Sequence, residues 1–249
     1  MLFFSRIFKF EKAQVAQMET DHRLNTRYTP GSSFPLHTYL HLARYEWKPS
    51  KILNISGNGL SLLTAREAKA TIGQDLKVQL VLGKYELVLD GRLAQTALRE
   101  KGRHCGIGLK FADFTEQKAY LQLLQPIVIG QSLRAVPEEQ IVQDEPQLIK
   151  QVYRGEGNSE LTAWLEKIPG TPLHRFELQA HEYFCRADVN SRELEAGLRP
   201  AAVPAGNQPA SGPTAAQLEE IHRFFRWIPP NFSSAVTDDI RVFIQRFTS

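Results

Sequence analysis

Two runs of alternating apolar and polar residues on either side of Gly83-Lys84 restrict the fold of this chain most strongly. The runs cover residues 75–82 and 85–97, and a two-residue connection that contains glycine is typical of a β-hairpin. Four further short strands are predicted at residues 34–43, 51–56, 60–64 and 104–111. Because these strands follow one another without a long helix, they predict a closed or nearly closed antiparallel barrel from about residue 29 to residue 111.

The part after the barrel has a more helical pattern. A helix is predicted at residues 115–129, with Thr115 as its N-cap and with Pro126 expected to bend or shorten it. Residues 130–150 lose regular periodicity and contain two prolines and several acidic residues, so we interpret them as a linker.

A second module is predicted from Gln151 onward. Its expected elements are a short helix at 161–168, one long strand at 173–187, a flexible loop rich in proline, alanine and glycine at 200–213, and two amphipathic helices at 214–227 and 234–247. These elements predict an α+β module.

The first 18 residues are predicted to form an amphipathic helix, because apolar residues such as Phe4 and Phe8 are interspersed with basic ones such as Arg6 and Lys9. The segment is too short and too often interrupted by charge to span a bilayer, and it lacks the pattern of a signal peptide. Its apolar face could bind a membrane surface or the groove of a partner. The general prevalence of amphipathic surface helices favours packing on the protein's own core.

Composition narrows the classes of function. The formal net charge of +3 is too small to indicate nonspecific nucleic-acid binding, so any anion must be bound by a local group of residues. The two cysteines, Cys105 and Cys185, are far apart in sequence and form no CxxC pair, which argues against a disulfide framework or a zinc cluster. We expect a cytoplasmic protein.

Residues 54–59, with the sequence NISGNG, are the best candidate for a ligand site. They combine an amide, a hydroxyl and backbone without a side chain, and apolar residues flank them on both sides. This pattern predicts a tight, rigid turn between two strands. Upstream, Arg23 and Arg27 form an RxxxR pair ahead of Pro30.

The two motifs, RxxxR followed by (Asp/Asn)-x-Ser-x-x-Gly, resemble the signature of the PilZ family, bacterial receptors for the second messenger cyclic di-GMP. The resemblance covers roughly residues 15 to 130. It includes the barrel, the final strand with the sequence Gly106-Ile107-Gly108 before Phe111, and the helix that follows. In this order, and with strands around them, the motifs are far more specific than either is alone.

The resemblance implies a mainly β fold with additional helices, in which a six-stranded antiparallel PilZ-type β-barrel with flanking helices precedes a smaller α+β C-terminal module. The expected domains are an N-terminal helix at 1–18, the PilZ-like barrel domain with its C-terminal helix at 19–130, a linker at 131–150 and the second module at 151–249. The expected ligand is cyclic di-GMP, and no cofactor or metal is expected. An unidentified protein partner is expected as well, and regulation of biofilm formation or motility is the implied output.

The ligand-binding residues implied by the resemblance are Arg23, Arg27, Asn54, Ser56 and Gly59. A guanidinium group can bind the O6 and N7 atoms of guanine, or a phosphate, through two parallel hydrogen bonds. Asn54 offers a donor and an acceptor, Ser56 offers a hydroxyl, and Gly59 lets the backbone approach the ligand or take up a positive φ. Two positions depart from the usual pattern: Asn54 replaces the more frequent Asp, and His22 replaces a basic residue, which leaves both one and two bound ligands open.

Other readings of the sequence have less support. A PilZ-fold adaptor of pilus, flagellar or secretion machinery would not bind nucleotide, and the intact arginine pair argues against it. No catalytic motif is found, so we do not expect an enzyme. His37 and His41 share a strand face but have no third metal ligand at a convincing spacing.

Overall fold

The structure is a computed structural model that describes residues 4, 26–42, 47–168, 170, 172–199 and 213–248. The chain divides into two compact units, residues 1–125 and 126–249. The domain bounds expected from the sequence stay predictions. No helix in the described ranges is long and apolar enough to cross a membrane.

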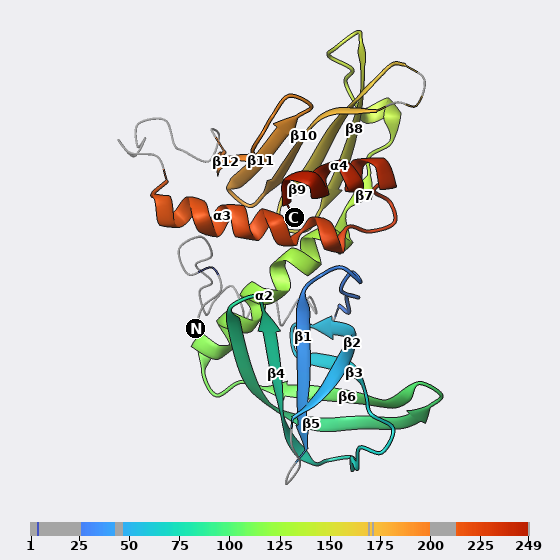
Figure 1. The fold of residues 1–249 in the computed structure, drawn as a ribbon, viewed down its shortest axis with the longest axis vertical. Coiled ribbons are helices and arrows are strands. Elements are labelled where there is room, and N and C mark those ends of the chain that lie inside the picture. The colour runs from blue at the N-terminus through green and yellow to red at the C-terminus, as the bar shows by residue number, and fades with distance from the viewer. Residues whose placement is uncertain are drawn as a thin grey trace. The chain divides into compact units, whose positions relative to one another are not determined.

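The first unit is built on a closed barrel of six antiparallel strands, in the order β1-β2-β3-β6-β5-β4 (Figure 1). The predicted barrel is therefore confirmed. The strands are β1 (Leu36–Leu42), β2 (Lys48–Ser56), β3 (Gly59–Thr64), β4 (Asp75–Leu82), β5 (Tyr85–Arg99) and β6 (Gly102–Lys110).

The two predicted turns join the strands as expected. Leu82 pairs with Tyr85, so Gly83-Lys84 is a two-residue hairpin turn, and Gly83 has a φ of +58°. Glycine has no Cβ and adopts this left-handed conformation without strain. In the same way Ser56 pairs with Gly59, so Gly57-Asn58 connects β2 and β3.

The barrel interior is filled by one side of each strand. Along β4 and β5 buried and exposed residues alternate, as the period of two in a strand requires. Fully buried side chains include Leu40, Ile55, Leu62, Leu80 and Leu89. The opposite side of each strand faces outward and is available for a binding surface.

Helix α2 (Phe114–Ser132) follows the barrel and is longer than predicted at both ends. Its N-cap is Asp113, not Thr115, because the Asp113 carboxylate accepts a hydrogen bond from the backbone N–H of Glu116 at 2.9 Å. Pro126 was expected to bend or shorten the helix; it lies inside the helix, which continues to Ser132, so it does not shorten it. The boundary between the two units falls immediately before Pro126.

Phe4 is the described residue of the predicted N-terminal helix. Its side chain is fully buried, and its backbone N–H and C=O both bond to the Gln122 side chain of α2 at 3.2 Å. At this residue the N-terminal segment packs on the first unit itself. The rest of residues 1–18, like Arg23, lies outside the described residues.

The second unit contains a six-stranded sheet in the order β12-β11-β10-β9-β8-β7, with all neighbours antiparallel. Its strands are β7 (Arg134–Ala135), β8 (Leu148–Gly155), β9 (Ser159–Glu166), β10 (Leu173–Ala180), β11 (Tyr183–Asp188) and β12 (Glu195–Leu198). A short 3₁₀ helix, η2 (Glu138–Gln140), lies between β7 and β8.

Two predictions for this unit were wrong. Residues 161–166 form most of strand β9, and the predicted helix at 161–168 is absent, because Leu161, Ala163 and Leu165 are buried on one face of a strand. Residues 173–187 form two strands, β10 and β11, because the chain turns at His181, whose φ is +54°. The expected loop at 200–213 falls, apart from Pro213, outside the described residues.

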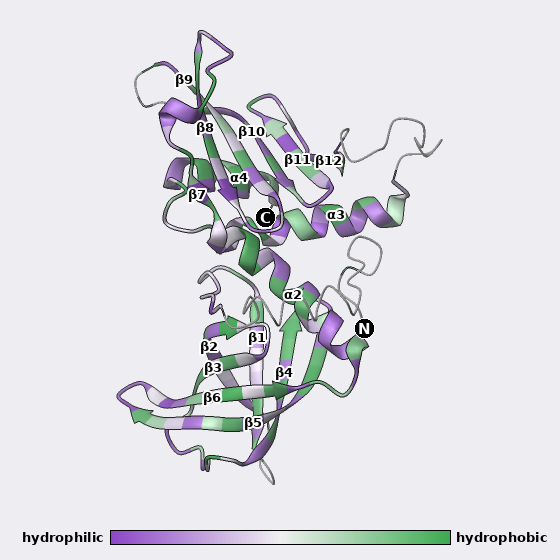
Figure 2. Ribbon diagram, turned by 180° about the vertical axis from the view of Figure 1, so that it is seen from behind, coloured by the Kyte–Doolittle hydropathy of each residue, from purple (hydrophilic) through white to green (hydrophobic). Residues whose placement is uncertain are grey.

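The two predicted C-terminal helices are present as α3 (Ala215–Trp227) and α4 (Asp238–Thr248), joined through the 3₁₀ helix η4 (Pro229–Asn231). Thr214 caps α3, and its side chain and that of Gln217 form a capping box. Both helices contact the sheet, α3 at β11 and β12 and α4 at β10. Hydrophobic and hydrophilic segments alternate along α3, as expected of a helix with one face on a core (Figure 2).

Candidate functional site

A two-hydrogen-bond bridge joins the arginine segment to the barrel. The backbone N–H of Tyr28 donates to the carbonyl of Ile55, and the N–H of Ile55 donates to the carbonyl of Tyr28, both at 2.8 Å. Tyr28 and Ile55 are buried, while their neighbour Arg27 is exposed. Because side chains alternate along extended backbone, this bridge places Arg27 on the outer face, beside Asn54 and Ser56.

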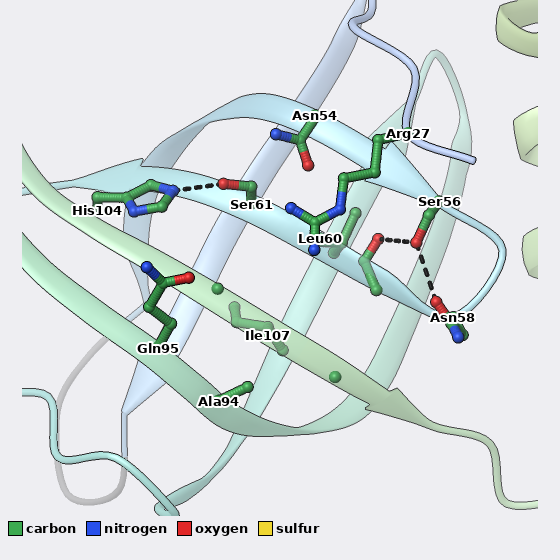
Figure 3. A pocket seen from close by; sticks show the side chains of 13 residues that line it. Arg27, Asn54, Ser56, Asn58, Leu60, Ser61, Ala94, Gln95, His104 and Ile107 are labelled. Carbon is green, nitrogen blue, oxygen red and sulfur yellow. Dashed lines mark hydrogen bonds between the residues drawn. The ribbon is translucent and has the colours of Figure 1, made fainter. Parts of the chain in front are cut away.

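The NISGNG turn is ordered by its own side chains. The Ser56 hydroxyl donates to Asn58 Oδ1 at 3.0 Å and lies 3.3 Å from the carbonyl oxygen of Gly59. In Figure 3 the Arg27 side chain extends over β3 between Asn54 and Ser56. Side-chain hydrogen bonds therefore hold the predicted turn, and Arg27 lies next to it.

Tyr120 of helix α2 holds the turn from the inside of the unit. Its hydroxyl donates to the carbonyl oxygen of Ser56 at 2.6 Å, and its ring packs on Phe111 with 5.5 Å between ring centres. Burial raises the pKa of Tyr120 well above its ordinary value, so the hydroxyl stays protonated and remains a donor. Sequence reasoning did not predict the bond from Tyr120 to the motif.

Gly59 is needed for close packing of strands, not for a positive φ. It is absent from the described glycines with positive φ, and a Cβ at this position would lie only 2.8 Å from the carbonyl oxygen of Ile107 on β6. Of the two alternatives left open for Gly59, a close backbone approach or a positive φ, the positive φ is therefore excluded. Its backbone forms part of the outer surface together with Gly106 and Gly108 of β6, which leaves a floor with few side chains.

Two β-bulges turn amide side chains toward this floor. The register shifts between Ile52 and Asn54 in β2, and between Leu93 and Gln95 in β5. Each bulge adds one residue, so Asn54 and Gln95 point outward although uninterrupted alternation would place Gln95 inward. Bulges of this kind re-aim side chains, and sequence reasoning predicted neither.

These residues line a single cavity of about 320 Å³ on the outside of the barrel (Figure 3). Four of the five residues predicted to bind a ligand lie together in its wall, namely Arg27, Asn54, Ser56 and Gly59. Sequence reasoning missed several other lining residues, among them Asn58, Ser61, Gln95 and His104. Arg27 is the permanently charged residue of the lining, which contains no carboxylate among the described residues. The cavity thus favours an anionic ligand with hydrogen-bonding edges.

The far end of the cavity has a second polar group. Ser61 on β3 is hydrogen-bonded to Nε2 of His104 on β6, and both line the cavity with Gln95. The other ring nitrogen of His104, Nδ1, is buried without a hydrogen-bond partner in the described part of the chain.

Other kinds of site have no support from the described ranges. They contain no group of three or more His, Cys, Asp or Glu residues able to hold a metal ion. Cys105 and Cys185 are buried free thiols, and burial raises the pKa of both, which disfavours the reactive thiolate.

Comparison with known proteins identifies the first unit. Residues 21–129 match the family model of the PilZ domain. No curated protein sequence matches the chain. Among solved structures, the PilZ domain with c-di-GMP of YcgR from Escherichia coli is similar, with 13% identity and a TM-score of 0.36, over 40% of this chain and 86% of that one. PlzA of Borreliella burgdorferi in complex with c-di-GMP is similar as well, with 8% identity and a TM-score of 0.33, over 75% of this chain and 86% of that one.

Proposed function

Since residues 21–129 form a PilZ domain, we propose that this protein is a receptor for cyclic di-GMP and binds the dinucleotide in the cavity on the outside of the barrel. The proposed contacts are made by Arg23, Arg27, Asn54, Ser56 and Gly59.

The observation that carries the proposal is the convergence of the two motifs. Arg27 and the NISGNG turn are about 30 positions apart in sequence, and the Tyr28–Ile55 bridge brings them to one cavity. The bridge joins the backbone of Tyr28, next to the arginine motif, to the backbone of Ile55, within the turn motif. An arginine that served only solubility would not need to be fixed in this way.

The chemistry of the lining suits this ligand. Cyclic di-GMP has two phosphodiester anions and two guanines, and the Arg27 guanidinium can pair with a phosphate or with guanine O6 and N7. Asn54 can donate and accept toward a guanine edge. The lack of a carboxylate among the lining residues avoids repulsion of the phosphates.

Arg23, which lies outside the described residues, is assigned the same type of contact because it stands four positions before Arg27. Binding by both arginines would fix residues 23–27 against the barrel. Such a change at the surface is a means of signalling to a protein partner or to residues 126–249. No catalytic role is proposed.

The test is calorimetric titration of the full chain with cyclic di-GMP, comparing the unaltered protein with Arg27→Ala and Arg27→Lys. A lost hydrogen-bonded charge pair costs about 1.5–3 kcal/mol, so Arg27→Ala should weaken binding by roughly 10- to 100-fold. Lysine should recover only part of the affinity, since it lacks the planar fork of donors.

Arg66→Ala is the matched control, because Arg66 is an exposed arginine of the same unit outside the cavity lining. It should bind like the unaltered chain. Equal affinities of Arg27→Ala and the unaltered chain would reject the assigned site. Absence of any binding by the unaltered chain would favour a PilZ-fold adaptor that does not bind nucleotide.

A further inference from the structure

The cavity extends well beyond the residues of the two motifs. Its outward-facing positions form one continuous row across four strands, in which Asn54 pairs with Ser61, Ser61 with Gly106, and Gly106 with Gln95. Neighbouring strands are roughly 4.8 Å apart, so the row spans about 14 Å between its outer Cα atoms. A ligand part that contacts Asn54 therefore leaves the end at Gln95 free for another part of the same molecule.

The two ends of the row carry the same chemical group for the same structural reason. Asn54 and Gln95 are both carboxamides, and each faces the cavity because a bulge immediately precedes it in its strand. Bulges are costly interruptions of pairing that commonly re-aim side chains at functional sites. Two of them, placed on opposite sides of one cavity, indicate that both amides face the ligand.

The floor between the two amides includes Gly106 of β6, which pairs with Gln95 of β5. Gly106 has no side chain, and the Gln95 amide lies close to it, with Oε1 3.7 Å from where a Cβ of Gly106 would be. Gln95 therefore reaches over the floor of the cavity and not away from it, as Figure 3 also shows. The Ser61–His104 pair bounds the same end.

We infer that Gln95 is a further ligand-binding residue that hydrogen-bonds a guanine base of the dinucleotide, at the end of the cavity opposite Asn54. The inference rests on the proposed function and adds a residue that neither motif contains. An amide offers a donor and an acceptor and no charge, so it suits the mixed edge of a base better than a phosphate. The two amides would then serve the two ends of one ligand that has two bases.

Gln95→Met is the decisive variant, because methionine keeps the approximate volume of the side chain and removes both hydrogen-bonding atoms. Affinity of the full chain for cyclic di-GMP is measured by calorimetry, and the free energy of unfolding is measured by urea denaturation. The loss of hydrogen bonds to a neutral base corresponds to roughly a five- to tenfold weaker affinity for cyclic di-GMP. The free energy of unfolding should not fall, because methionine keeps the side-chain volume and Gln95 is exposed on β5.

Gln79→Met serves as the matched control, since Gln79 lies on β4 and bonds to Glu86 outside the cavity. An unchanged affinity in Gln95→Met would overturn the inference, as would a loss of affinity matched by a loss of stability, which indicates a packing role only. Arg27→Ala, measured in parallel, separates the two proposals. If binding depends on Arg27 and not on Gln95, the inference alone fails, whereas an unaltered chain that does not bind cyclic di-GMP overturns both.

Discussion

At the scale of single residues, Ser56 has two functions that substitution can separate. Its hydroxyl donates to Asn58 and lines the cavity, while its backbone carbonyl accepts the Tyr120 hydroxyl. Ser56→Ala removes only the hydroxyl, so we expect the free energy of unfolding to fall by less than about 1 kcal/mol. Affinity for cyclic di-GMP should fall roughly five- to tenfold, measured by calorimetry. Ser50→Ala, on the same strand, should change neither quantity, and a Ser56→Ala protein with full affinity would exclude this hydroxyl from the site.

Tyr120→Phe tests the support of the turn from inside the unit. The change leaves the ring in place and removes the donor to the buried carbonyl of Ser56. We expect the free energy of unfolding to fall by about 1–3 kcal/mol, because a buried acceptor loses its partner. Denaturant unfolding measures this, with Tyr39→Phe on β1 as a half-buried control. Equal stability of Tyr120→Phe and the control would show that the bond contributes nothing.

The residue scale is also where sequence reasoning was least complete. The motif residues could be selected because their spacing is regular, but Gln95 could not, since a bulge leaves no motif. The sequence did contain one indication of the bulge. The inward residues of β5 include Leu87, Leu89 and Leu93, so strict alternation would place the polar Gln95 inward as well. A polar residue at a position predicted to be buried indicates a break in register.

At the scale of elements, two glycines that pair across strands β3 and β6, Gly59 and Gly108, differ in how much space surrounds them. A Cβ on Gly59 would meet the Ile107 carbonyl at 2.8 Å, whereas a Cβ on Gly108 would have no neighbour within 4 Å. Gly59→Ala should therefore lower the free energy of unfolding by about 1–3 kcal/mol. Gly108→Ala should keep the stability and weaken cyclic di-GMP binding, because its methyl group stands on the cavity floor. Thermal unfolding and calorimetry check the pair, and the reverse order of stabilities would contradict the structure.

The hairpin between β10 and β11 should make stability depend on pH. Burial lowers the pKa of His181 from 6.5 to about 4, so the folded chain binds fewer protons than the unfolded chain between these values. The contribution of His181 to the free energy of unfolding should be complete above pH 6.5. It should decrease as pH falls toward 4, by on the order of 2 kcal/mol.

His181→Asn should flatten this dependence, because asparagine tolerates the positive φ of this position and does not titrate. Urea unfolding at pH 5 and pH 7, followed by fluorescence of Trp164 and Trp227, measures the difference. A slope that survives in His181→Asn would assign the pH dependence to other groups.

The strands of the barrel could be predicted from the sequence, whereas the elements of the second unit could be predicted only in part. The difference has a physical reason. Barrel strands are flanked by glycine turns and alternate clearly, whereas residues 161–168 have apolar positions compatible with both a helix and a strand. The turn at His181 has no glycine or proline, so nothing local marked the end of β10.

At the scale of the whole molecule, the proposed ligand site lies within residues 1–125, and residues 126–249 form a second folded unit with its own sheet and core. The sequence indicated both units, and the family match, residues 21–129, covers most of the first and ends four residues into the second. Under the proposed function, a signal from the ligand would start at the outer face of the barrel.

The central claim is that cyclic di-GMP binds on this outer face, between the bulged strands β2 and β5. Amide chemical shifts of the isotope-labelled full chain, recorded by NMR during titration with cyclic di-GMP, test it most directly. We predict that the largest changes fall on Arg27, on residues 54–61 and 104–108, and on Gln95, all in or beside the cavity lining. Binding that shifts residues elsewhere and leaves these amides unchanged would contradict the account.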